Sequence, residues 1–121
     1  MSAHPSFQTE IEFELPKGYL DDSGTLHRRG TMRLATAADE ILPLRDPRVQ
    51  QNEAYLAVIV LARVIIRLGS LPHIDTGVIE GLFASDLAYL ERLYETFNSG
   101  DEGDASPAEK RPRRITAVGE A

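Results

Sequence analysis

The sequence predicts an α+β fold: an N-terminal β-hairpin packed on a small bundle of three to four helices, followed by a disordered C-terminal tail. Three observations predict it. Residues 7–15 and 25–34 alternate apolar and polar side chains, with the period of two that a half-buried strand requires. Residues 36–98 instead repeat their apolar positions at helical spacing. From Ser99 onward Gly, Ser, Pro and charged residues replace that pattern, and such a segment buries too little apolar surface to offset its ordering entropy.

Each strand of the predicted hairpin has one apolar face. On the first strand this face holds Phe7, Ile11, Phe13 and Leu15, with Glu10, Glu12 and Glu14 opposite. On the second it holds Leu26, Met32 and Leu34, with His27, Arg29 and Arg33 opposite. Residues 21–24, Asp-Asp-Ser-Gly, favour a turn between the strands, because Asp and Ser bond the local backbone and Gly accepts positive φ.

The turn also predicts a register for the hairpin. The expected opposite pairs are Leu20 and Thr25, Phe13 and Met32, and Glu12 and Arg33. Pro16 and Gly18 interrupt the first strand, so we expect a bulge or bend there.

Start signals for helices follow the hairpin. They are a capping box from Thr36 to Asp39, the pair Asp46 and Pro47, then Asp75 and Ser85. The principal helix is expected from Asn52 or Glu53 to Leu68, where Gly69 ends it.

The principal helix is apolar around most of its circumference, with Arg63 and Arg67 as its one polar ridge. A hairpin and three short helices cover only part of such a helix in a chain of this size. We therefore expect an exposed apolar stripe that binds a partner. The residues expected on this partner-binding surface are Leu56, Val60, Val64, Leu82 and Phe83.

The chain of 121 residues has the usual size of one domain. We expect a flexible N-terminus over residues 1–6, a single α+β domain over residues 7–98 and a disordered charged tail over residues 99–121.

The absence of cysteine and of a secretory signal favours a cytoplasmic protein. The net charge of −6 argues against nucleic-acid binding, and the apolar run of residues 54–62 is too short to span a membrane.

No constellation of residues predicts catalysis, a metal site or a cofactor. His4, His27 and His73 each lack a convincing companion. The acidic pairs at residues 21–22 and 39–40 are better explained by a turn and a helix N-terminus. Residues 21–24 resemble half of a calcium loop but lack the later bidentate Glu.

The basic residues 110–114 follow an acidic stretch of nearly equal charge, so a solvated tail is favoured over a peptide arm that orders on a partner.

Three segments carry a resemblance to a known family. They are residues 13–28, Phe-Glu-Leu-Pro-Lys-Gly-Tyr-Leu-Asp-Asp-Ser-Gly-Thr-Leu-His-Arg; residues 32–40, Met-Arg-Leu-Ala-Thr-Ala-Ala-Asp-Glu; and residues 86–94, Asp-Leu-Ala-Tyr-Leu-Glu-Arg-Leu-Tyr. They resemble the small tail assembly proteins of Mu-like phages with contractile tails and of related contractile injection systems. The resemblance implies a tail assembly chaperone whose client is the tape-measure protein, and it implies no catalytic residues.

We therefore expect a non-enzymatic assembly factor that shields a helical protein client, with self-association left open. The alternative is a permanent structural subunit, such as a baseplate or cap component, that joins a neighbour through the hairpin edge. Finding the protein in purified mature particles would distinguish the two. An enzyme or a regulator is a third class, disfavoured by the missing site chemistry.

Overall fold

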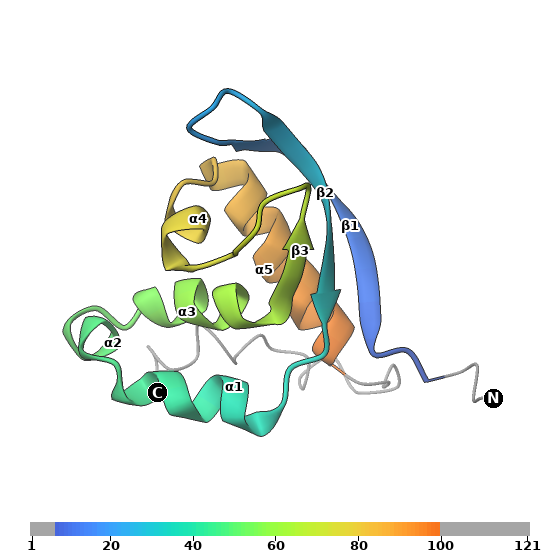
Figure 1. The fold of residues 1–121 in the computed structure, drawn as a ribbon. Helices are drawn as coiled ribbons and strands as arrows, with labels where there is room; N and C mark the ends of the chain where they lie inside the picture. The colour runs from blue at the N-terminus through green and yellow to red at the C-terminus, as the bar shows by residue number, and fades with distance from the viewer. Residues whose placement is uncertain (1–6, 100–121) are drawn as a thin grey trace.

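A computed structural model describes residues 7–99 and confirms the α+β fold class (Figure 1). The antiparallel sheet has the strand order β1-β2-β3, with β1 at Glu10–Leu20, β2 at Leu26–Arg33 and β3 at Ile65–Leu68. The helices are α1 (Ala37–Ile41), the 3₁₀ helix η1 (Leu42–Arg45), α2 (Pro47–Gln51), α3 (Tyr55–Val64), α4 (Thr76–Glu80) and α5 (Ala84–Asn98). The expectations for residues 1–6 and 100–121 lie outside the described residues.

The bulge expected in the first strand is confirmed, and it changes the register of the hairpin. The register shifts between Glu14 and Tyr19. Beyond the shift, Leu20 lies opposite Leu26; before it, Phe13 lies opposite Gly30 and Glu12 opposite Thr31. The three expected pairs are therefore wrong: the turn is one residue longer than expected, which sets Leu20 opposite Leu26, and residues of β1 in the bulge have no partner on β2.

A buried carboxylate from a distant helix holds this bulge. Asp86, which has no exposed surface, accepts hydrogen bonds from the backbone N–H groups of Lys17 and Gly18, both at 2.9 Å. Gly18 has a φ of 108°, a left-handed conformation that favours glycine. Asp86 satisfies two N–H groups that the strand ladder leaves free.

Two side chains of β2 near the hairpin tip have the opposite burial from that expected. Leu26, expected in the core, is 51% exposed, whereas His27, expected on the basic outer face, is buried. Phe13 and Met32 are buried as expected. His27 is buried because the loop after β3 covers it: Gly69 lies against the His27 ring, and the Ser70 N–H donates to its Nδ1.

The turn chemistry of residues 21–24 is confirmed. The backbone N–H of Asp21 donates to the Thr25 carbonyl at 2.9 Å, and Gly24 has a φ of 90°. One carboxylate oxygen of Asp21 accepts from the N–H groups of Ser23 and Thr25. The side chain thus closes the turn it was expected to close.

The principal helix is shorter than predicted, because the last four residues of the predicted helix form a strand. α3 ends at Val64, and the next four residues form β3, which pairs with β2 through Met32 opposite Ile65 and Gly30 opposite Leu68. Short apolar runs fit a buried helix and a buried strand equally well, and the open edge of β2 favours the strand here. Arg63 and Arg67 therefore do not form one ridge, because they belong to different elements.

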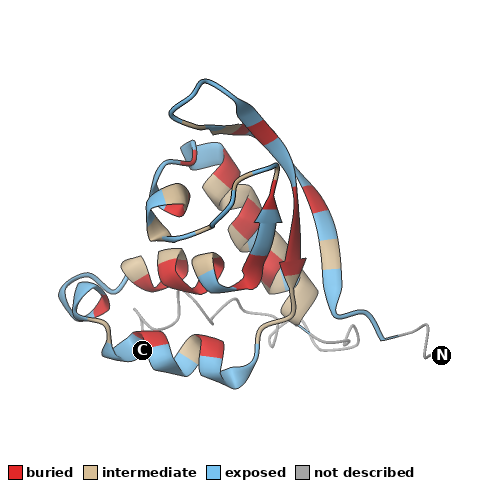
Figure 2. Cartoon of the chain, viewed as in Figure 1, coloured by how far each residue is buried: buried red, intermediate tan, exposed pale blue. Residues whose placement is uncertain are grey.

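The helix starts are confirmed at three of the four expected positions. Thr36 and Asp39 form the capping box, and the side chains of Asp46 and Asp75 accept from the first turns of α2 and α4. Ser85 is not a cap, because α5 already begins at Ala84. The helices pack around α3 and against the sheet, and the buried residues gather where they meet (Figure 2).

Because neighbouring side chains of β1 point to opposite faces of the sheet, two neighbouring substitutions should lower the unfolding free energy by different amounts. Phe13 is buried and its ring makes an edge contact with Tyr89, with centroids 6.5 Å apart, whereas Glu12 is exposed. We expect Phe13→Ala to cost about 3–5 kcal/mol of unfolding free energy. Glu12→Ala should stay within about 0.5 kcal/mol. Urea unfolding measures both, and equal losses would contradict the observed facing.

Candidate protein-binding surface

The structure buries most of the residues expected to bind a partner. Leu56 is 3% exposed, Val60 and Val64 are fully buried, and Leu82 is 9% exposed. Only Phe83, at 48%, is accessible. The expected stripe on the principal helix is therefore absent, because α1, α2, α4, α5 and β3 all contact α3.

Exposed apolar side chains instead gather where α1 passes into η1. Ile41, Leu42 and Leu44 are 58%, 46% and 41% exposed, and we call these three residues the α1–η1 ridge. Pro43 between them is buried. The proline packs inward while its neighbours point outward, so the ridge presents three large apolar side chains within four residues. Leu20 and Leu26, opposite each other at the hairpin tip, form a smaller exposed pair, and the other large exposed apolar side chains in the described residues are Phe7, Ile66 and Phe83.

A buried ionic cluster anchors α1 beneath the ridge. The Asp39 carboxylate, 2% exposed, accepts from two nitrogens of Arg33 at 2.7 and 3.0 Å and from Nε of Arg63 at 2.9 Å. It also accepts from the backbone N–H of Thr36 at 2.7 Å. These bonds, those from Arg33 above all, hold the pKa of Asp39 well below its usual range.

Two further contacts tie the same region to α5. The hydroxyl of Tyr94 donates to the Glu40 carboxylate, and the side-chain oxygen of Asn98 accepts from the backbone N–H of Ala35 at 2.9 Å. Tyr94 is 1% exposed. α1 is thus fixed to β2, α3 and α5, and its exposed side chains stand on a rigid support.

The other end of η1 is fixed by a polar network. Asp46 accepts from the backbone N–H of Arg48 at 2.8 Å and from its guanidinium at 2.9 and 3.0 Å. The Arg48 side chain is the main cause that lowers the pKa of Asp46 to about 2. The same guanidinium lies 5.0 Å from the ring centre of Tyr55, whose hydroxyl donates to Glu80.

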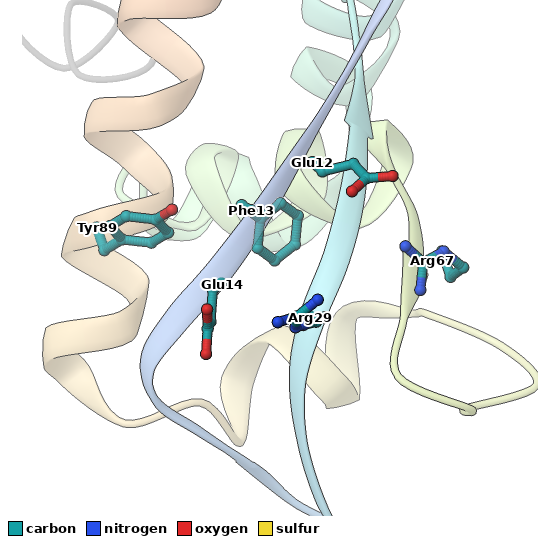
Figure 3. Close-up of a pocket in the computed structure, with 6 residues that line it drawn as sticks. All are labelled: Glu12, Phe13, Glu14, Arg29, Arg67 and Tyr89. Carbon is teal, nitrogen blue, oxygen red and sulfur yellow. The ribbon is translucent and has the colours of Figure 1, made fainter.

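An open cleft of about 560 Å³ lies on the sheet, away from the ridge (Figure 3). It is lined by Glu12, Phe13, Glu14, Arg29, Arg67 and Tyr89. Arg67 donates to the Thr31 hydroxyl at 3.1 Å, and Arg29 makes no ion pair with another described residue. The lining holds no Ser, Thr, Cys or His, and its titratable groups are two carboxylates, two guanidinium groups and one phenol.

His27 has a structural role in the described chain. Its Nε2 lies 2.7 Å from the Asp21 carboxylate, and its Nδ1 accepts from the backbone N–H of Ser70 at 3.2 Å. A Cβ on Gly69, which has a φ of 57°, would lie 2.1 Å from that Nδ1. The ring therefore joins the hairpin turn to the loop after β3. His73 is exposed, and His4 lies outside the described residues.

Sequence reasoning missed the ridge and the ionic cluster beneath it. The signal for the ridge was present, since residues 41–44 place three large apolar side chains around a proline in a segment too short to bury them all. No comparable signal marked the cluster, because Arg33 and Arg63 lie thirty residues apart and meet at Asp39 only in the fold.

Comparisons with known proteins add no family to this description. None of the protein-family models, curated proteins or solved structures compared with the chain matches it. Over residues 7–99, every helix is too short or too polar to traverse a bilayer. In the same residues, no three potential metal-ligating side chains come together. The part of the chain that the structure describes is thus a small α+β domain with three exposed apolar side chains on the anchored α1–η1 segment and a smaller exposed pair, Leu20 and Leu26, at the hairpin tip.

Proposed function

We propose that this protein is a non-enzymatic assembly factor of the cytoplasm that binds a helical segment of a client protein on the α1–η1 ridge. Its segments 13–28, 32–40 and 86–94 resemble tail assembly proteins, which supports a tail assembly chaperone of a contractile phage tail or injection system. The client proposed is the tape-measure protein. The observation that carries the proposal is the exposure of Ile41, Leu42 and Leu44 on a firmly anchored segment.

The size of the ridge favours a reversible contact. Three half-exposed aliphatic side chains offer a few hundred Å² of apolar surface, which at about 25 cal/mol per Å² gives several kcal/mol before the costs of association. A stable protein interface usually buries about 800 Å² on each partner. The ridge alone is too small for that, so it suits a chaperone that releases its client better than a permanent subunit.

Placing a charge on the ridge tests the proposal. We expect Ile41→Glu, Leu42→Glu and Leu44→Glu each to reduce the soluble yield of a co-expressed tape-measure protein several-fold, because a carboxylate opposes burial against an apolar helix. The variants themselves should stay folded, since exposed substitutions change stability by about 0.5 kcal/mol or less. Client solubility and the variant's own thermal melt are the two measurements.

The matched control is Phe83→Glu, which makes the same change at an exposed apolar side chain away from the ridge. It should protect the client normally. Normal protection by all three folded ridge variants would contradict the proposal. Recovery of the protein at fixed stoichiometry from purified mature particles would instead support a structural subunit.

A further inference from the structure

His27 is a buried ionisable residue at the point where the hairpin meets the loop after β3. It is 4% exposed, and both nitrogens of its ring have partners. Nε2 lies 2.7 Å from an oxygen of the Asp21 carboxylate, and Nδ1 lies 3.2 Å from the backbone nitrogen of Ser70. The ring thus links the hairpin turn to residues 69–71, the turn that follows β3.

The two partners determine where the ring carries its proton. A backbone N–H can only donate, so the bond from Ser70 requires an Nδ1 that has no proton and accepts. Hydrogen bonds from His27, Thr25 and Ser23 hold the pKa of Asp21 well below its usual range, so this side chain is a carboxylate and can only accept. The proton of the ring is therefore on Nε2, and the ring that makes both bonds is neutral.

The turn after β3 is built around this ring. The N–H of Gly69 donates to the Arg29 carbonyl at 2.7 Å, and the next N–H along the chain, that of Ser70, donates to the His27 ring. Gly69 has a φ of 57°, and a Cβ there would lie 2.1 Å from Nδ1. Glycine therefore allows both the turn and the close approach of the backbone to the ring.

Protonation of the ring sets two donors against each other. The second proton goes to Nδ1, which then faces the Ser70 N–H, and neither group can accept. The bond to Asp21 remains, because Nε2 donates in both forms of the ring. We propose that His27 is a pH-sensitive latch: the neutral ring holds residues 69–71 against the hairpin, and the protonated ring releases them while it stays bound to Asp21.

The direction of the pH dependence follows from proton binding. The latched form binds one proton fewer than the released form, so a falling pH favours release. Asp21 favours a charged ring, whereas Arg29, two residues along β2 on the same face, opposes it. The ring of Tyr19 packs beside that of His27, with centroids 6.4 Å apart. Histidine is the residue type that ordinarily gains its proton between about pH 8 and pH 5.

The latch lies away from the α1–η1 ridge. In Figure 1 the hairpin tip projects from one end of the sheet, whereas α1 follows the other end of β2. The ladder between β2 and β3 ends at Leu68 opposite Gly30, before the turn that the latch holds. Release therefore leaves this ladder in place, and the proposal goes beyond the client binding on the ridge without depending on it.

Nuclear magnetic resonance of the full chain tests the latch without any substitution. At about pH 8, the His27 ring should be the Nε2–H tautomer, and a scalar coupling across the hydrogen bond should join its Nδ1 to the Ser70 amide nitrogen. On titration to about pH 5, this coupling should vanish as the ring gains its proton. The hydrogen-exchange protection of residues 69–71, corrected for the intrinsic rate at each pH, should fall about tenfold or more with the same midpoint.

Two histidine variants provide matched controls. His73 is exposed in the same loop, so His73→Gln should leave the pH dependence of residues 69–71 unchanged. His27→Gln has no ionisable ring and should remove this dependence. If that variant does not fold, the titration of the wild-type chain still decides the proposal.

Four results would overturn the latch. They are a coupling that persists in the protonated ring, a ring that stays neutral down to about pH 5, and a loss of protection that survives His27→Gln. The fourth is an equal loss of protection at Gly24, whose N–H closes the hairpin turn, because that loss would indicate general unfolding.

Discussion

Val60→Glu should prevent the domain from folding. The Val60 side chain is fully buried in α3 among Leu56, Leu61, Val64 and other core residues. Placing an unpaired carboxylate there costs several kcal/mol even if the group becomes protonated, a large part of the 5–15 kcal/mol that is typical for a whole domain. Circular dichroism and the dispersion of amide proton signals at 25 °C measure the outcome.

Phe83→Glu is the matched comparison for this loss. Phe83 is 48% exposed and precedes α5, so the introduced charge stays in water and the melting temperature should change little. If Val60→Glu melted cooperatively near the wild-type temperature, α3 would have to expose this position, and the partner-binding stripe expected from the sequence would again be tenable.

Asp39→Ala should cause the largest loss among the polar substitutions. Removing the carboxylate leaves the guanidinium groups of Arg33 and Arg63 without their shared partner and removes the capping bond to Thr36. Breaking a buried ion pair from one side costs about 3–5 kcal/mol, and since the Arg33 and Arg63 side chains are 32% and 37% exposed, we expect a loss of about 3 kcal/mol. In a domain of this size each kcal/mol lowers the melting temperature by about 4–8 °C.

Asp46→Ala is the matched control, because Asp46 also pairs with an arginine and caps a helix but lies nearer the surface. Its loss should be about 1 kcal/mol, the usual contribution of a helix N-cap. Equal losses for the two variants would show that the Asp39 cluster contributes no more than an ordinary cap.

The contribution of Asp39 should also depend on pH in a defined direction. Its pKa in the folded chain lies below the ordinary value of 3.8, chiefly because of the bonds from Arg33. A carboxyl group with a depressed pKa stabilises the folded state above its unfolded-state pKa, and this stabilisation is lost as the pH falls. The difference in urea midpoint between wild type and Asp39→Ala should therefore be constant near neutral pH and shrink below about pH 4. A difference that stayed constant down to pH 2 would contradict this assignment.

The sequence determined those features whose causes are local. Asp21 and Gly24 make the turn because their own backbone and nearest neighbours supply the bonds. Asp46 and Asp75 start helices by accepting from N–H groups two and three residues away. The alternation of residues 10–15 fixed which side of the first strand is apolar, and the interruption near Gly18 indicated the bulge before its partner was known.

Only the tertiary structure decided the features that depend on contacts between distant residues. The bulge is held by Asp86, 68 residues from Gly18, so the register of the hairpin cannot be read from the hairpin alone. Residues 65–68 become a strand because β2 offers them an edge to pair with. The same long-range packing buries Val60 and leaves Leu42 exposed, since apolar character alone does not say which surfaces other elements will cover.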